Sequence, residues 1–429
     1  MDETKKWTLY LIFLVAGFAT GIGTIGLFPQ FWLEYGITGL VLHMFFLVLF
    51  GYVAILETER VMKSGYYFVE LFTKVLRKPA MVLTFFAVIA MFLSYYSANV
   101  MLSLLSPVVG TGAAGRLIAK VIMFAIMFVI LTRAKEKTFS IMAIGSIIFV
   151  VAVVITTIAF RTIIPENAAY LGMAKHMLFA RNGITDNMIK DAALRAVYGV
   201  GLGFAFYLML GSFLNERFSP KLIVGTGIFI QFIIGILSTI TVVYAVAPTT
   251  PGRLLQYVYG GDEGAIQLMA ELPQILSKYP TLLALIALSV FFAGLTSILP
   301  TAEVGLQIAE STLKVSRNKA ATYLIAVSLA LGIFDSVPSL ADMMLKAVSI
   351  ALFFTAIYEI YPVLKGEVSP VGKAASIIVA VLLGIAGITA FYTYGKNGGV
   401  YVLSVILAAV LVLFGILGNS IMFGKRAEA

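Results

Sequence analysis

Two stretches of the chain place polar chemistry inside long apolar segments. Residues 17–31 read GFATGIGTIGLFPQF, with four glycines and a proline. Residues 291–306 read FFAGLTSILPTAEVGL, in which Thr296 and Ser297 are adjacent hydroxyls. Glycine and proline disfavour a helix interior, and a broken helix exposes main-chain carbonyls. Carbonyl and hydroxyl oxygens suit a hard cation such as Na+, which takes several oxygen ligands.

Each stretch also has a plain structural interpretation. Glycines let membrane helices pack closely through small-xxx-small spacing, and a membrane Ser or Thr commonly bonds to the carbonyl four residues earlier. A second glycine-rich segment favours function, since residues 195–213 read RAVYGVGLGFAFYLMLGSF. Unwound backbone survives at membrane depth only where it faces a cavity or an ion, so two matched breaks predict a transport site.

The composition places these stretches in a membrane. Of 429 residues, 61% are hydrophobic and 12% are charged, whereas a soluble domain carries roughly 25% charged residues. Because about 20 apolar residues cross the hydrocarbon core, the sequence predicts an all-α polytopic membrane protein with about twelve transmembrane helices. The predicted segments are 8–31, 37–58, 79–107, 114–132, 138–163, 193–215, 221–247, 281–313, 319–335, 340–364, 372–393 and 400–423.

Charge and rare residues narrow the function further. Lys and Arg gather in alternate short loops on the side of the N-terminus, so we expect a multi-pass protein of the plasma membrane with both termini cytoplasmic. The net charge of +9 is therefore a topology signal and does not indicate nucleic-acid binding. No signal-peptide pattern is found. The absence of cysteine, the two histidines and the lack of an acid–base constellation argue against a thiolate or histidine metal site and against an enzyme.

The segments form a single predicted transmembrane domain, 1–429. The first five-helix repeat covers 8–163, the second covers 193–364, and two additional helices cover 372–423. An odd number of helices per half makes the second half enter the membrane from the opposite side, which is an inverted repeat. We expect the long loops 164–192 and 248–280 to pack as short helices over the external mouth.

The motifs GFATGIGTIGLFP, VYGVGLGFAF and FFAGLTSI resemble the neurotransmitter:sodium symporter family, especially its prokaryotic amino-acid transporters. The double tyrosine Tyr95–Tyr96 and the run LKVSRNKA after the eighth segment strengthen the resemblance. It implies the bacterial leucine-transporter fold, with ten core helices in two inverted repeats and the first and sixth helices unwound. It also implies that a sodium gradient drives the uptake of an amino acid or a related small molecule.

The resemblance implies two sodium sites. The site between the first and eighth helices maps onto Gly17, Thr20, Ala293, Thr296 and Ser297; Thr20 replaces a valine whose carbonyl is the ligand. The other site maps onto Ala19, Thr24 and Gln231. There Thr24 replaces an asparagine, Gln231 stands nearest a second asparagine, and Gly199 replaces a threonine. Side-chain oxygens are thus changed or lost, which predicts a weaker second site and favours one coupled sodium.

The resemblance also implies a substrate site. The carboxylate would lie on the amides of Gly21 and Gly23 and on the Tyr96 hydroxyl, under an aromatic lid, Phe204. Small residues in the sixth helix open space that Phe92 and Tyr198 partly fill, so we expect an apolar or aromatic amino acid. The full set of expected substrate residues is Ala19, Gly21, Gly23, Phe92, Tyr96, Tyr198, Gly199, Gly201, Phe204, Ser297 and Thr301.

The expected gates depart from the family pattern. Leu27 replaces the arginine of the external gate, while Arg195 stands where the family usually has glutamine. We expect Arg195 to take over this gate with Asp342 as its partner, beside Tyr96 and Phe204. At the cytoplasmic end, Lys5 or Lys6 is expected to pair with Glu310. Chloride dependence stays open.

The leading hypothesis is a symporter that imports an amino acid with sodium by alternating access. A proton-coupled carrier of the same architecture is the alternative within transport; such carriers place a lysine amine at the sodium position, and the fifth segment has no charge before Arg161. A non-transporting receptor or a channel is the alternative outside it. The expected partners are the amino acid, sodium and membrane lipid, and oligomer formation is possible.

Overall fold

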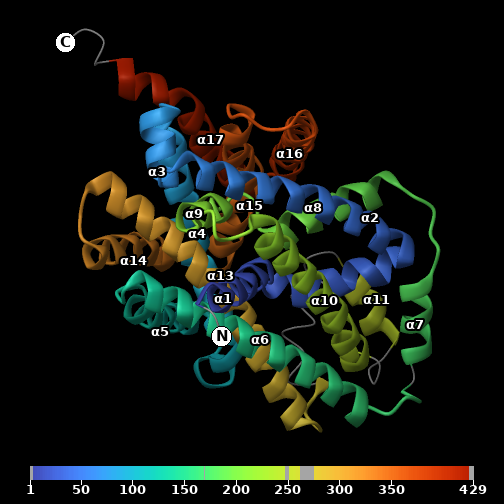
Figure 1. The fold of residues 1–429 in the computed structure, drawn as a ribbon. Coiled ribbons are helices and arrows are strands. Elements are labelled where there is room, and N and C mark those ends of the chain that lie inside the picture. Colours follow the sequence, from blue (N-terminus) through green and yellow to red (C-terminus); the bar gives the residue numbers. More distant parts are fainter. Residues whose placement is uncertain (1–2, 169, 247–250, 261–274, 425–429) are drawn as a thin grey trace.

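The computed structural model describes residues 3–168, 170–246, 251–260 and 275–424. In this part the chain forms helices that lie side by side in a bundle (Figure 1). The helices are α1 (Glu3–Ala19), α2 (Ile22–Ser64), α3 (Phe68–Glu70), α4 (Pro79–Val109), α5 (Ala113–Leu131), α6 (Lys135–Ile163), α7 (Leu171–Phe179), α8 (Asp186–Val200), α9 (Phe206–Phe213), α10 (Pro220–Val246), α11 (Pro251–Tyr259), α13 (Pro280–Leu313), α14 (Arg317–Phe334), α15 (Pro338–Leu364), α16 (Pro370–Asn397) and α17 (Val400–Gly424), with a π-helical turn η1 (Leu71–Val75) after α3.

Proline sets the start of several long helices. Pro79, Pro280, Pro338 and Pro370 stand at the beginning of α4, α13, α15 and α16. Proline has a fixed φ that suits a helix, and its missing N–H has no intrahelical partner at that position. These residues therefore start a new helix at each of these four positions.

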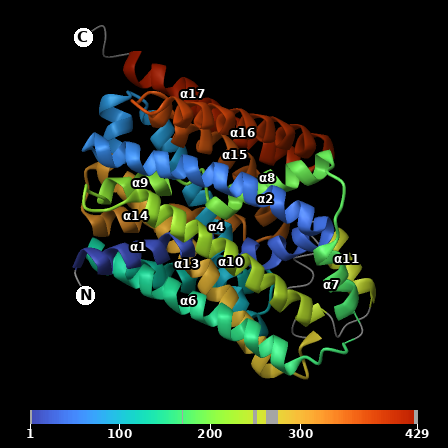
Figure 2. The same cartoon turned by 45° about the vertical axis from the view of Figure 1, so that its right-hand side comes forward.

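Each of the twelve predicted segments has a helical counterpart. Nine described helices are long and apolar enough to cross a membrane, counting α2 once. The first segment divides between α1 and the start of α2, the sixth divides into α8 and α9, and the ninth is α14. The prediction of an all-α polytopic membrane protein is thus confirmed. Figure 2 shows the N and C marks at one end of the bundle and α7 and α11 at the opposite end.

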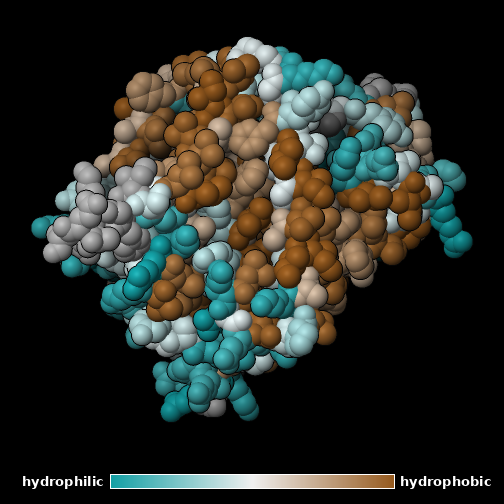
Figure 3. Space-filling model, turned by 90° about the horizontal axis from the view of Figure 1, so that it is seen from above, coloured by the Kyte–Doolittle hydropathy of each residue, from teal (hydrophilic) through white to brown (hydrophobic). Residues whose placement is uncertain are grey.

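The outer surface of the bundle is apolar. Exposed aliphatic side chains follow α16 and α17, among them Ile385, Ile388, Ile406 and Val410. Most of the face in Figure 3 is hydrophobic, with hydrophilic residues gathered toward its margins. Hydrocarbon tails solvate such a surface well, which agrees with a membrane location.

The first break is short. Helix α1 ends at Ala19 and α2 begins at Ile22, so only Thr20 and Gly21 leave the helix. Pro29, one of the helix-disfavouring residues of the 17–31 stretch, lies inside α2 and does not break it. Proline has no N–H to donate to the Ile25 carbonyl, and at the next residue of the same turn the Gly26 carbonyl accepts the Tyr257 hydroxyl at 2.6 Å.

The second break is longer and depends on glycine. Gly201 and Gly203 have φ values of 80° and 102°, which side chains on L residues rarely adopt. A Cβ on Gly201 would lie 2.6 Å from the Phe18 ring, and one on Gly203 would lie 2.7 Å from the Leu352 carbonyl oxygen. Ala205 also has a positive φ of 58°. The break between α8 and α9 therefore requires both the backbone freedom and the small size of its glycines.

The part of α2 around Gly36 is fastened to the loop before α8. Gly36, with a φ of 62°, kinks α2 and forms a β-bridge with Arg181. The Ile37 amide donates to the Ala180 carbonyl at 3.0 Å, and the Asn182 side chain donates to the Glu34 carbonyl at 3.2 Å. These backbone contacts fix the loop on the kink.

A buried ion pair joins α4, α5 and the end of α14. The Lys120 ammonium pairs with Asp335 and donates to the Gly332 carbonyl at 2.8 Å. The other Asp335 oxygen accepts the Ser94 hydroxyl at 2.5 Å. Both charged side chains are fully buried. Sequence reasoning missed this pair, although a lysine inside a membrane segment is a signal that it has a partner.

Replacing Lys120 alone should therefore destabilise the fold. Lys120→Met leaves the Asp335 charge buried and unpaired, and we expect a loss of about 3–5 kcal/mol of stability. The double variant Lys120→Met/Asp335→Leu should recover most of that loss, because it removes both charges. Thermal unfolding of the purified variants in detergent measures both effects, and equal damage in the single and double variants would contradict the prediction.

Candidate functional site

The two predicted polar stretches meet at the first break. The Thr296 hydroxyl of α13 lies 3.1 Å from the Gly17 carbonyl oxygen. The Ser297 hydroxyl lies 3.3 Å from the carbonyl oxygen of Thr20 and 3.1 Å from that of Ala293. All five residues expected at the first sodium site thus contribute an oxygen to one cluster. We call this set Gly17, Thr20, Ala293, Thr296 and Ser297 the oxygen cluster.

The oxygen cluster has more acceptors than protons to share. Ser297 Oγ lies within 3.5 Å of four carbonyl oxygens, although a hydroxyl donates only one proton. Oxygens that bind a hard cation at about 2.4 Å lie roughly 3.4 Å apart when they meet at right angles. The spacing and the surplus of lone pairs therefore fit a small hard cation.

A close contact between α1 and α6 sets the position of the Gly17 carbonyl. A Cβ on Gly17 would lie 2.1 Å from the Ser146 hydroxyl of α6 and 3.0 Å from the Thr296 Cβ. No larger residue fits there without moving α1 away from α13. The glycine thus brings its own carbonyl within reach of the Thr296 hydroxyl.

Tyr96 reaches the same break from α4. Its hydroxyl accepts the Ile22 amide at 2.8 Å, at the first residue of α2. The amides in the first turn of a helix lack intrahelical acceptors and favour an anion. Since the Tyr96 oxygen already accepts a hydrogen bond, its own proton is free to donate to a carboxylate. Gly21 borders this place, because a Cβ there would lie 3.0 Å from the Tyr96 hydroxyl.

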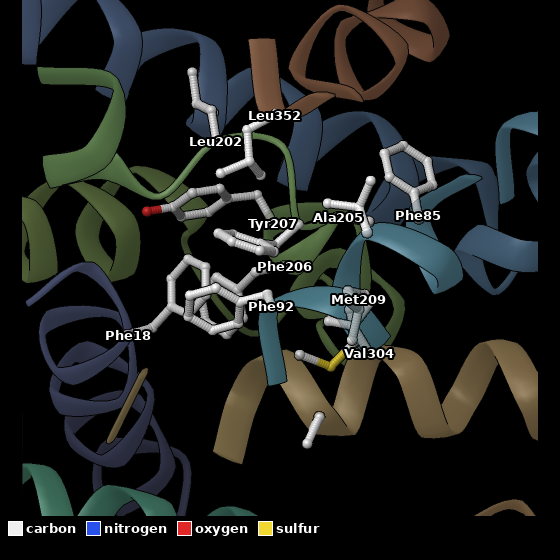
Figure 4. Packing of buried hydrophobic residues seen from close by; sticks show 14 of the residues in the cluster. Phe18, Phe85, Phe92, Leu202, Ala205, Phe206, Tyr207, Met209, Val304 and Leu352 are labelled. Atoms are coloured by element: carbon white, nitrogen blue, oxygen red, sulfur yellow. The ribbon is translucent and has the colours of Figure 1, made fainter. Parts of the chain in front are cut away.

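Aromatic rings line the space beside Tyr96. The Phe92 ring stacks on Tyr96 at 4.6 Å and lies 4.7 Å from the Phe204 ring. From the other side, Phe18 of α1 stacks on Phe206 of α9 at 3.8 Å. Figure 4 shows Phe18, Phe92 and Phe206 pointing toward one another. Rings from α1, α4 and α9 thus meet next to the broken backbone, and the Phe18–Phe206 pair was not foreseen from the sequence.

Tyr96→Phe tests the hydroxyl. A hydrogen bond to a charged group contributes about 1.5–3 kcal/mol, so we expect amino-acid affinity to fall by about 10- to 100-fold while sodium affinity changes little. Tyr95→Phe is the matched control, since no hydrogen bond of the Tyr95 hydroxyl is found in the described chain. Equilibrium binding of a labelled amino acid measures both, and equal losses in the two variants would contradict this role.

The residues of the expected second sodium site only partly converge. Gln231 of α10 is buried, and its Oε1 has no hydrogen-bond partner in the described chain. The Gln231 amide nitrogen lies 3.1 Å from where a Gly199 Cβ would be. Ala19 and Thr24 are buried on either side of the break. An acceptor without a donor is thus present, but within the described part of the chain no hydrogen bond joins Gln231 to Ala19 or Thr24.

Other expected substrate residues lie in varied surroundings. Thr301 is buried and donates to the Ser297 carbonyl at 2.8 Å, a bond within its own helix. Tyr198 is 37% exposed. Gly199 faces Gln231 and α2, and Gly201 faces Phe18. The aromatic wall is therefore built by Phe92 and Phe204, while the glycines make room for neighbouring side chains.

The expected external ion pair does not form. No ion pair joins Arg195 to Asp342 among the described residues. Instead, Arg195 lies within electrostatic range of Glu34 and His43 of α2 and of Tyr257 of α11. Arg195 lies on the side of α8 that packs against α2, whereas Asp342 lies in the first turns of α15. The expected and observed neighbours of Arg195 differ because α8 points this side chain toward α2. The sequence does not reveal that direction.

The expected Lys6–Glu310 pair does not form either. Lys6 is exposed and lies over the Tyr10 ring at 5.5 Å. Glu310 lies 3.9 Å from both Lys135 and Arg317. These two cations belong to α6 and α14, which end beside α13, so they reach Glu310 before the first helix can.

Two buried carboxyl groups interact near the second break, and one of them, Glu359, holds its backbone. Glu359 of α15 accepts the Gly203 amide at 2.8 Å with one oxygen and the Ala205 amide with the other. Glu57 of α2 is fully buried and interacts electrostatically with Glu359. Neither Glu57 oxygen has a hydrogen-bond partner in the described chain. Glu359 thus replaces the acceptors that the unwound backbone has lost.

Comparison with solved proteins identifies the fold. The chain aligns with the crystal structure of MhsT in complex with L-phenylalanine, with a TM-score of 0.60 over 90% of this chain and 98% of that chain. The chain has the fold of MhsT. The sequence identity is 18%, and no family model and no curated protein sequence matches the chain. MhsT is a bacterial transporter of the neurotransmitter:sodium symporter family, so the resemblance seen in the motifs is confirmed at the level of the fold.

Proposed function

We propose that this protein is a sodium-coupled symporter that imports an apolar or aromatic amino acid by alternating access. The oxygen cluster carries the proposal, because it gathers five oxygens at a helix break and has more acceptors than donors. The first turn of α2 and the Tyr96 hydroxyl lie beside it and suit a carboxylate. Cation and carboxylate would therefore bind next to each other.

Sodium would couple to substrate through this shared backbone. Binding at the oxygen cluster would hold α1 against α13 and order the break, so that the carboxylate meets a fixed set of donors. Each sodium ion that moves inward across about 100 mV contributes about 2.3 kcal/mol, apart from its concentration term. The partly assembled second site favours one coupled ion. The division into inverted repeats, 8–163 and 193–364, remains part of the proposal.

The rings of Phe92, Phe204 and Phe18 support an apolar or aromatic side chain on the substrate. A ring or branched aliphatic group would be surrounded by aromatic faces, which contribute more than buried area alone. MhsT was solved with L-phenylalanine, and its likeness in fold makes this amino acid the first probe to test.

A screen of the twenty amino acids on the purified protein tests the proposal. Thermal-shift and scintillation-proximity measurements would compare sodium with potassium at fixed pH. We expect apolar or aromatic amino acids to bind in sodium and to bind at least tenfold more weakly in potassium. Equal binding in both salts would contradict sodium coupling, and binding of small polar amino acids alone would contradict the substrate class. Uptake driven by a proton gradient without sodium would favour the proton-coupled alternative.

A further inference from the structure

The loop after α2 and the end of α9 are joined at the end of the bundle that is rich in Lys and Arg. The Phe68 amide donates to the Ser212 hydroxyl at 2.9 Å. The rings of Tyr67 and Phe213 lie edge to face, 6.3 Å apart. Helix α9 follows the glycine break, so this unit is connected to α8 only by the unwound residues 201–205. We call Tyr67, Phe68, Ser212 and Phe213 the mobile side.

A second unit lies opposite. Arg317 at the start of α14 donates to both oxygens of the buried Glu303 of α13, at 2.9 and 2.6 Å. Its Nε donates to the Arg133 carbonyl at 2.9 Å, just before α6. A bidentate arginine–carboxylate pair fixes both partners in orientation as well as in distance. The ends of α13, α14 and α6 are thus held together, and we call them the fixed side.

Lys135 lies between the two sides. Its ammonium is 5.5 Å from the centroid of the Tyr67 ring and 5.8 Å from that of the Phe213 ring. On the fixed side it lies 3.9 Å from Glu310. Both ring distances are within the range of cation–π attraction. Phe139, one turn later in α6, contacts the same Phe213 ring at 4.8 Å.

We propose that Lys135 is the residue that latches the cytoplasmic gate of this transporter. The inference rests on the proposed function, in which substrate leaves at this end. In the closed state the ammonium of Lys135 holds the rings of Tyr67 and Phe213. When the mobile side moves away, water and Glu310 replace the rings, and the lysine stays on the fixed side.

The strength of this contact suits a gate. A cation–π contact at a partly exposed position is weak, so two of them bias the closed state by only about 5- to 20-fold. A gate must open in every cycle, and ligands shift such an equilibrium only when it is close to balance. A buried ion pair such as Lys120–Asp335 would not suit a gate, because separating its partners would leave a buried charge without a counter-charge.

Thiol labelling tests the latch without a substrate. The chain has no cysteine, so Ala309→Cys supplies a single thiol, buried at 3% exposure next to Glu310. In this background we expect Lys135→Gln and Phe213→Leu to raise the rate of maleimide labelling by about fivefold. Lys135→Arg should label within twofold of the parent, because arginine also binds ring faces.

Lys137→Gln is the matched control. It removes the same charge from the same helical turn, where the side chain is exposed, and it should label like the parent. The unfolding temperature of each variant separates gate opening from general loosening, since only general loosening lowers it. Equal rates in the parent and in Lys135→Gln would overturn the proposal. Fast labelling of Lys135→Arg would also overturn it, because the positive charge would then be irrelevant.

The same variants separate this inference from the proposed function. With sodium and labelled L-phenylalanine, Lys135→Gln should dissociate the amino acid about fivefold faster than Lys137→Gln. If the parent binds no amino acid and does not respond to sodium, the proposed function fails, while the labelling rates still decide the role of Lys135. If the parent binds and transports but labelling is unchanged, only the latch is wrong.

Discussion

Replacing both Thr296 and Ser297 with alanine is expected to abolish sodium-dependent binding of the amino acid. The two hydroxyls are the side-chain oxygens of the oxygen cluster. An interaction of a hydroxyl with a charged group contributes about 1.5–3 kcal/mol, so losing two weakens sodium binding by about 100-fold or more. Amino-acid binding, titrated with sodium on purified protein, measures the loss.

The matched control for this double variant is Ser289→Ala. Ser289 is a buried hydroxyl of the same helix, bonded to Thr156 and to the Leu285 carbonyl and remote from the break. It should keep sodium affinity within about threefold, since it removes only neutral hydrogen bonds away from the oxygen cluster. Unchanged sodium dependence in the double variant would show that the cation binds elsewhere. Equal losses in the control would show a general effect of removing hydroxyls from α13.

Glu359→Gln is expected to lower stability by about 2–4 kcal/mol and to abolish transport. The carboxylate accepts two backbone amides of the second break, one with each oxygen. Glutamine has a single acceptor oxygen. One of the two buried backbone amides therefore loses its acceptor, and the other bonds to a neutral oxygen in place of a carboxylate. Thermal unfolding and uptake into liposomes measure the two effects.

Glu57→Gln provides the contrast. Two neighbouring buried carboxyl groups cannot both be ionised without a cation. Glu359 has the two amide donors that favour the anion, whereas neither Glu57 oxygen has a hydrogen-bond partner in the described chain, so we expect the proton on Glu57. An amide has nearly the shape of a protonated carboxyl, and we expect Glu57→Gln to stay within about 1 kcal/mol of the parent. If Glu57→Gln were as damaging as Glu359→Gln, this assignment of the proton would be wrong.

The sequence predicts the oxygen cluster well because its members lie in two short motifs. Glycines locate the breaks, and Thr296 and Ser297 follow each other on one helix, so a single contact between α1 and α13 assembles the set. The two expected ion pairs, Arg195–Asp342 and Lys6–Glu310, are not found among the described residues for the opposite reason. For Arg195, Lys6 and Glu310 the sequence offers several candidate partners of opposite charge. Which of these partners forms the ion pair depends on the direction in which each helix points its side chains.

Two further features fall outside what patterns of residue type reveal. Lys120 and Asp335 lie far apart in sequence, and only packing brings α5 against the end of α14. Pro29 has the sequence signal of a helix break but remains helical, in a turn whose Gly26 carbonyl accepts the Tyr257 hydroxyl of another segment. Local composition therefore indicates where a helix is weak, and tertiary contacts decide whether it breaks.

The fastening of the loop before α8 onto the kink of α2 has a consequence for how the two broken helices can move. The first break is followed by α2 up to Gly36 and the second is preceded by α8, and this loop connects one to the other through Ile37 and Ala180. The Tyr35 hydroxyl also donates to Asp191 of α8 at 2.6 Å. A tilt of either segment is therefore expected to draw the other along. If the proposed function holds, these two parts of the broken helices would move together as one unit.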